Sequence, residues 1–219
     1  MDRDFWLGLW EANQLGWHLR ETNPLLARHW PRLGIPSDAG VFVPLCGKSL
    51  DMRYLESLGH PVVGVELSDA AVQAYFEEAG EEPARTDLPN LARYAGAHTT
   101  LYCGDYFDLT ASDLPAVRAV YDRGALIALP PSLRARYVDH MLRILPADAQ
   151  ILLVAYEYDQ TRADGPPHSV AANEVAALYG PRCRIVGLER TTSSVVSPRL
   201  AEAGIGSATE TVYHIVKDR

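Results

Sequence analysis

Cysteine is scarce in this chain of 219 residues. There are three, Cys46, Cys103 and Cys183, and no Cys-x-x-Cys pair. An odd number argues against a disulfide framework, and zinc sites need closely spaced ligand pairs. The seven histidines are scattered, with no ligand spacing such as His-x-x-x-His. We therefore expect no disulfide and no metal, as fits a protein of the reducing cytoplasm.

Long apolar runs and clusters of basic residues are also missing. No stretch approaches the roughly 18 apolar residues of a membrane-spanning helix. The first four residues include two acids, where a signal peptide would carry positive charge. The formal net charge is -8 and the Lys and Arg residues are dispersed, whereas binding to phosphates requires clustered cations. We expect neither a membrane nor a nucleic-acid partner.

The turn Pro44–Ser49 contains too few glycines to be a phosphate-binding loop. The turn Pro44–Ser49 (PLCGKS) follows the apolar run Val41–Val43. A P-loop would need a glycine five positions before Gly47, where Phe42 stands, and a dinucleotide fingerprint needs further glycines. A single glycine at the start of a helix still lets backbone approach a ligand. The turn therefore disfavours an ATPase and a nucleotide-dependent oxidoreductase.

Apolar β-rich runs alternate with helical patterns from residue 40 onward. This alternation predicts a Rossmann-like, doubly wound α/β fold with a mostly parallel sheet covered on both faces. Two longer runs, Arg182–Glu189 and Glu210–Val216, predict an antiparallel edge pair at the C-terminal end of the chain. The other predicted strands are 41–43, 61–66, 99–102, 117–122 and 151–155, and the helices between them are 50–58, 69–79 and 133–145. We expect Ser68 to cap the helix at 69–79.

All four tryptophans, Trp6, Trp10, Trp17 and Trp30, precede the first predicted strand. Two short helices are predicted there, at about 3–12 and 23–32. We interpret residues 1–35 as a helical arm that covers a single domain spanning residues 1–219. Trp6 and Trp30 are expected to be core anchors of this arm, because aromatic residues dominate cores. A sheet covered on both faces needs no partner, so we expect a monomer.

Polar residues follow three of the predicted strands, where open α/β sheets place their ligands. Glu66 lies about 20 residues beyond the glycine turn, the position of an acid that accepts ribose hydroxyls; its alternative is an ordinary acid beside a helix N-terminus. Asp105 and Tyr106 are candidates for contacts with an adenine, or simply part of a turn. Arg123 could hold a carboxylate or an anionic substrate, with Asp122 keeping it in a fixed pose, or the two could form a surface ion pair.

Several segments together resemble the thiopurine S-methyltransferase family in its bacterial form. They are Phe5-Trp6 with Trp10, Gly16-Trp17-His18, Asn23–Leu26, Val43–Ser49, Val63–Ser68, Asp122–Leu126, Tyr158-Asp159 and Gly165–Pro167. The resemblance runs from about residue 4 to the C-terminus. It implies a class I methyltransferase fold and S-adenosyl-L-methionine as methyl donor, with S-adenosyl-L-homocysteine as product. The implied reaction is S-methylation of an aromatic or heterocyclic thiol or thione.

The resemblance also implies roles for individual residues. The cofactor-binding residues would be Trp10, Leu45, Glu66, Asp105, Tyr106 and Arg123, and the acceptor would meet Trp17 and Arg199. No general base is required, although Asp122 could assist. His168 departs from the family, which usually has Phe there, and this changes the polarity of the loop Asp159–His168, a candidate lid. Alternatives are methylation of selenium or tellurium compounds or other small nucleophiles, and a non-catalytic adenosine-ligand binding protein.

Overall fold

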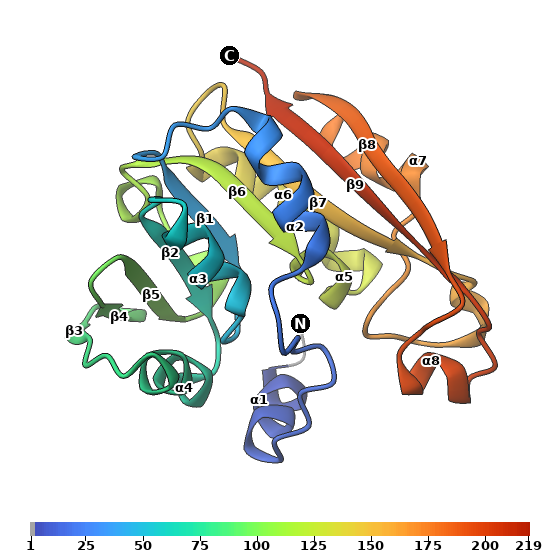
Figure 1. Cartoon of the computed structure of the whole chain (residues 1–219), viewed down its shortest axis with the longest axis horizontal. Coiled ribbons are helices and arrows are strands. Elements are labelled where there is room, and N and C mark those ends of the chain that lie inside the picture. Colours follow the sequence, from blue (N-terminus) through green and yellow to red (C-terminus); the bar gives the residue numbers. More distant parts are fainter. Residues whose placement is uncertain (1–2) are drawn as a thin grey trace. The chain divides into compact units, whose positions relative to one another are not determined.

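The computed structural model describes residues 3–219, which form two compact units that meet in sequence after Tyr121. In the first unit the strands follow the order β3-β4-β5-β2-β1-β6. They are β1 (Gly40–Pro44), β2 (Val62–Glu66), β3 (Ala84–Asp87), β4 (Leu91–Ala95), β5 (Thr99–Gly104) and β6 (Val117–Arg123), the last of which runs on into the second unit. Figure 1 shows β1, β2 and β5 beside the helices of this unit.

The centre of this first sheet is parallel, as predicted. β1 pairs in parallel with β2 and with β6, and β2 pairs in parallel with β5. Every residue of β1 is buried, which explains why its sequence is a continuous apolar run rather than an alternating one. Within the register, Pro44 lies opposite Val65 and Glu66 lies opposite Cys103. The turns that follow β1, β2 and β5 therefore share one edge of the sheet.

Two edge strands of the first unit were not predicted. β4 pairs antiparallel with β5, and β3 pairs antiparallel with β4. All four residues of β3 are exposed, so the strand carries no apolar pattern that would reveal it in the sequence. The sheet is therefore antiparallel at this edge as well as in the C-terminal pair that the sequence predicts.

Serine caps begin both central helices of the first unit. α3 (Leu50–Ser57) follows Ser49, and α4 (Asp69–Ala79) follows Ser68. The Ser68 hydroxyl accepts a hydrogen bond from the Ala71 amide at 3.3 Å, which satisfies one of the unpaired N–H groups of the first turn. The predicted cap and the predicted span of α4 are both confirmed. Short 3-10 turns, η2 (Tyr106–Asp108) and η3 (Ala111–Asp113), follow β5.

The N-terminal segment contains α1 (Arg3–Glu11), α2 (Pro24–His29) and the 3-10 turn η1 (Trp30–Leu33). Trp30 is a core anchor, as predicted: it is buried and its indole N–H donates to His60 Nε2 at 3.0 Å. The same prediction for Trp6 is wrong. Trp6 is only half-buried, on a helix that contributes no buried residue, and its ring packs edge to face on Trp17 instead of the core.

The second unit contains α5 (Ala125–Ala128), α6 (Pro131–Ile144), β7 (Gln150–Glu157), η4 (Gln160–Arg162), α7 (Ala172–Tyr179), β8 (Cys183–Ser193), α8 (Pro198–Glu202) and β9 (Ala208–Lys217). β9 lies between β7 and β8 and is antiparallel to both. Figure 1 shows β8 and β9 as two long strands side by side, with α8 in the connection between them. The predicted antiparallel pair at the C-terminal end is confirmed. Among residues 3–219, no helix has the length and apolarity to cross a membrane.

The packing of β2 allows a test of the core beneath the candidate site. A Cβ on Gly64 would lie 2.7 Å from Cys46 Sγ and 2.6 Å from Leu101 Cδ2, so Gly64→Ala clashes with two buried side chains and both contacts must relax. We expect it to lower the free energy of unfolding by about 1–3 kcal/mol, measured by urea denaturation. Gly187→Ala is the matched control, because nothing lies within 4 Å of a Cβ at that strand glycine. Equal stability of the two variants would contradict the close packing.

Candidate active site

The carboxylate of Glu66 connects two turns at the carboxyl edge of the first sheet. Its Oε2 accepts the Gly47 amide at 2.9 Å and its Oε1 accepts the Ser68 amide at 2.8 Å. The side chain is buried, at 7% exposure. Burial raises the pKa of the carboxyl, and the amides of Ser68, Gly47 and Leu67 oppose that rise. Each oxygen retains further lone-pair capacity after accepting one amide.

The turn after β1 has an unusual backbone. Leu45 has φ 46° and Gly47 has φ 53°, the left-handed region that side chains other than glycine rarely adopt. The Cys46 amide donates to the Val65 carbonyl at 3.0 Å, which fixes the turn to the end of β2. Cys46 itself is buried, and burial followed by the nearby Glu66 charge raises the pKa of its thiol well above the usual range.

Trp10 of the N-terminal segment covers this turn, and two further tryptophans pack beside it. A Cβ on Gly47 would lie 3.2 Å from Cζ2 of Trp10, so the indole ring lies directly against the glycine. Trp10 and Trp17 meet edge to face with centroids 6.0 Å apart, and Trp6 meets Trp17 in the same way at 5.2 Å. All three rings are half-buried. The structure therefore brings Trp10, Trp17 and the turn of Leu45 together.

The two predicted adenine-side residues, Asp105 and Tyr106, separate in the structure. Asp105 caps the 3-10 turn η2 by accepting the Phe107 amide at 3.0 Å, and its other oxygen lies 3.8 Å from the guanidinium of Arg3. Tyr106 is buried, and its ring is stacked on Phe42 of β1 with centroids 6.4 Å apart. Asp105 is thus at the sheet edge, whereas the ring of Tyr106 belongs to the core below it. Arg3 was not predicted, because it precedes every motif.

The predicted residues of the second unit start where β6 ends. Asp122 is fully buried, and it accepts the Leu126 amide at 3.2 Å and the Tyr137 hydroxyl at 2.8 Å. Burial raises the pKa of this carboxyl to about 6. Arg123 is partly exposed and is followed by Gly124 with φ 102°. The Asp122 contacts therefore fix the short turn that presents Arg123.

Arg199, in α8, lies against the predicted lid. Its Nη1 donates to the Pro166 carbonyl at 3.4 Å, and the Tyr158 hydroxyl donates to the adjacent Pro167 carbonyl at 2.7 Å. His168 is half-buried in the same loop, and its amide donates to the Ile127 carbonyl at 2.7 Å. Burial and the cations Arg134 and Arg199 lower the pKa of its imidazole. The loop is thus bonded on several sides.

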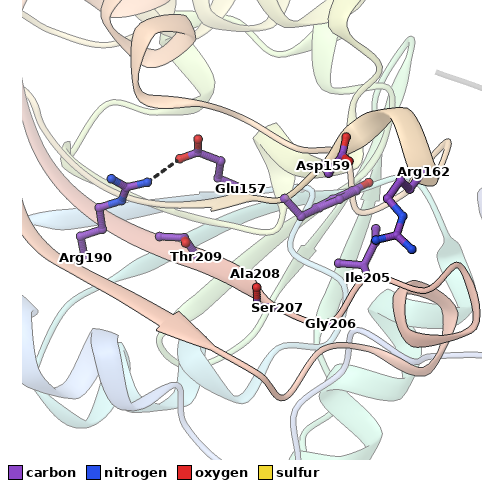
Figure 2. Close-up of a pocket in the computed structure, with 10 residues that line it drawn as sticks. Glu157, Asp159, Arg162, Arg190, Ile205, Gly206, Ser207, Ala208 and Thr209 are labelled. Carbon is purple, nitrogen blue, oxygen red and sulfur yellow. Dashed lines mark hydrogen bonds and ion pairs between the residues drawn. The ribbon is translucent and has the colours of Figure 1, made fainter.

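A cavity of about 430 Å³ lies at the carboxyl end of β7. Figure 2 shows its charged side chains, with Arg190 donating to Glu157 at 3.2 Å, and Arg162 and Asp159 on the other side. Its remaining lining comes from Tyr158 and from Ile205–Thr209. None of the residues that the sequence predicts for the cofactor or the acceptor lines this cavity. It flanks the loop that Tyr158 holds and is not the predicted site.

The residues at the edge of the first sheet fit an adenosine ligand without phosphates. A carboxylate at the end of the second strand has lone pairs left for two ribose hydroxyls. The turn beside it offers an apolar, aromatic wall from Leu45 and Trp10 rather than a cradle of successive glycine amides. Within the part of the chain that the structure describes, no three His, Cys, Asp or Glu side chains form a group that could hold a metal ion.

Comparison with known proteins agrees with this geometry. The family model for thiopurine S-methyltransferase (TPMT) matches residues 1–218. A thiopurine S-methyltransferase of Pseudomonas fluorescens (strain Pf0-1) is 45% identical over 215 residues, which cover 98% of this chain and 99% of the relative.

Two solved structures share the fold. One is the Burkholderia thailandensis 1,6-didemethyltoxoflavin-N1-methyltransferase with bound 1,6-didemethyltoxoflavin and S-adenosylhomocysteine, with a TM-score of 0.66 and 18% identity, covering 99% of this chain and 87% of that one. The other is the N-methyltransferase NodS from Bradyrhizobium japonicum WM9 in complex with S-adenosyl-L-homocysteine, with a TM-score of 0.64 and 13% identity, covering 100% and 99%. The predicted class I methyltransferase fold is thereby confirmed. The chain belongs to the thiopurine S-methyltransferase family and is an S-adenosylmethionine-dependent methyltransferase.

Proposed function

We propose that this enzyme methylates the sulfur of an aromatic or heterocyclic thiol or thione, with S-adenosylmethionine as donor. The observation that carries the donor side is the buried Glu66 carboxylate, held by two backbone amides at the edge of the sheet. The family name supports a thiopurine-like acceptor. The bound donor supplies a methyl group already activated by the positive charge of its sulfonium.

On the donor side, the protein's task is to bind and to exclude water. Glu66 would accept the ribose hydroxyls, and the turn of Leu45 and Gly47 would support the methionine half. Trp10 would cover that turn, and an aromatic face favours a neighbouring cation electrostatically. Asp105 would face the adenine from the edge of β5. These roles require that the hydrogen bonds from the two backbone amides keep the Glu66 carboxylate in place before any ligand binds.

On the acceptor side, the protein's task is to orient a sulfur nucleophile. An acidic thiol is already partly thiolate near neutral pH, so no general base is needed and orientation contributes most of the rate. Arg123 would attract the anionic form of the acceptor or clamp a donor carboxylate, and Asp122 would keep its turn rigid. Trp17 and Arg199 would contact the acceptor, and His168 would make this side more polar than a phenylalanine would.

The acceptor class is tested by product analysis with a labelled methyl donor. The panel contains heterocyclic thiols, aliphatic thiols, selenols and tellurium or selenium oxyanions. We expect the highest kcat/KM with heterocyclic thiols, because their low pKa supplies the thiolate at neutral pH. Faster turnover of the selenium or tellurium compounds would favour the alternative acceptor. Binding of S-adenosylhomocysteine without turnover of any compound would favour a non-catalytic binding protein.

The role of Glu66 is tested by Glu66→Gln. The substitution removes the charge and leaves an amide N–H₂ facing a backbone donor, so we expect S-adenosylhomocysteine to bind about 10–100-fold more weakly by calorimetry. Glu77→Gln is the matched control, since Glu77 is exposed on α4. If Glu66→Gln and Glu77→Gln bind the ligand alike, Glu66 does not hold the ribose.

The two candidate roles of Arg123 are separated by Arg123→Met. Loss of a cation that stabilises charge in a dry site lowers kcat/KM by about 30–1000-fold. If Arg123 clamps a carboxylate of the donor, its loss also weakens S-adenosylhomocysteine binding. If it is a cation that favours the thiolate, its loss shifts the pH–rate profile to higher pH and leaves that affinity unchanged. The control is Arg118→Met, an exposed arginine of the same strand. Wild-type kcat/KM in Arg123→Met would exclude both roles.

A further inference from the structure

Arg134 is an arginine on the apolar face of α6. It lies three, four and seven residues before Tyr137, Val138 and Met141, so all four share one face of the helix. The three apolar-face neighbours are buried, and Arg134 itself is only 1% exposed. A buried guanidinium is costly unless hydrogen bonds compensate for the lost water. The contacts of Arg134 must therefore account for its burial.

The contacts of Arg134 converge on the base of one loop. Its Nε donates to the Leu129 carbonyl at 3.0 Å, and its Nη1 donates to the Ser169 carbonyl at 3.1 Å. The same Nη1 lies 2.7 Å from both carboxylate oxygens of Glu174, at the start of α7. These three partners come from the end of α5, from the residue that closes the loop Asp159–His168, and from the helix that follows it.

Ser169, which Arg134 contacts, also connects the two ends of the loop by hydrogen bonds to the backbone of Tyr158. Its hydroxyl accepts the Tyr158 amide at 3.0 Å and donates to the Tyr158 carbonyl at 2.8 Å, and its own amide donates to Gln160. Tyr158 in turn donates its phenolic hydroxyl to the Pro167 carbonyl at 2.7 Å. The hydrogen bonds between Ser169 and Tyr158 therefore close the loop at its base. Arg134 stabilises this closure through its hydrogen bond to the Ser169 carbonyl.

We propose that Arg134 is a positioning residue for the methyl acceptor, because it fixes the Tyr158–Ser169 closure and with it the Pro166 carbonyl against which Arg199 lies. This inference rests on the proposed function, in which Arg199 and the loop meet the acceptor. The bond from Arg199 to Pro166 is long, at 3.4 Å, so it depends on where the loop places that carbonyl. Glu174 keeps the guanidinium charge compensated and its orientation fixed.

The test compares Arg134→Lys, which keeps the charge but loses the planar fork, with wild type. We expect the acceptor KM to rise about tenfold or more while S-adenosylhomocysteine affinity changes less than about twofold. Amides of Ser169 and Val170 should exchange with solvent about tenfold faster, and those of β9 should not. Ser169→Ala removes both hydroxyl bonds to Tyr158 without touching the buried charge, and should give the same pattern.

Arg182→Gln is the matched control. Arg182 forms an exposed ion pair with Asp139, which also belongs to α6, and its loss should leave all of these quantities unchanged. An unchanged acceptor KM in folded Arg134→Lys and Ser169→Ala overturns the proposal. So does exchange that rises equally in the loop and in β9 with a parallel loss of donor affinity, which indicates general destabilisation. If wild type methylates no thiol, the proposed function fails, while the local exchange still decides whether Arg134 fixes the loop.

Discussion

The candidate site depends on one buried carboxylate that is bonded to the backbone rather than to a cation. Glu66 accepts the amides of Gly47 and Ser68, which belong to the turns after β1 and β2. Backbone dipoles offset part of the cost of removing the charge from water. Because Gly47 adopts a positive φ and Ser68 caps α4, both amides are fixed by their own local structure. The Glu66 carboxylate is therefore preorganised, and the two amides also fix the orientation of its remaining lone pairs.

The two units use opposite chemistry to fix their loops. In the first, the carboxylate of Glu66 accepts hydrogen bonds from backbone N–H groups. In the second, the guanidinium of Arg134 donates hydrogen bonds to the carbonyls of Leu129 and Ser169. Both devices place a buried charge under a loop and bond it to main-chain atoms, and Arg134 is also paired with the carboxylate of Glu174. Most substitutions leave main-chain partners in place, proline at an N–H donor excepted, so the geometry of each loop tolerates variation in the side chains that it presents.

Much of this could be predicted from the sequence where the signal is local. The apolar run before the turn, the acid that ends β2 and the serine before α4 each have a short-range physical cause, and all three are found as expected. The failures concern residues whose place is decided by distant partners. β3 is fully exposed and exists because β4 offers it hydrogen bonds. Trp6, on a helix with no buried residue, packs on Trp17 instead of the core.

Tyr106 and Arg134 have partners inside the core that the sequence does not reveal. Tyr106 follows a strand, as a ligand-facing residue would, and its ring stacks on Phe42, more than 60 positions earlier; its contact with an adenine stays a prediction. Arg134 could have been noticed, because its spacing from Tyr137, Val138 and Met141 puts a charge on an apolar helix face. Its purpose could not be predicted, since the carbonyls that it binds lie in loops with no regular pattern.

Cys46 has a consequence for an enzyme that handles an alkylating agent. It lies in the turn between Leu45 and Gly47, with its sulfur packed beneath Gly64 of β2. A thiol attacks electrophiles only as its thiolate, and burial beside the Glu66 charge keeps the pKa of Cys46 well above its usual range. The turn can therefore include sulfur without offering a nucleophile. Burial therefore disfavours methylation of Cys46 itself.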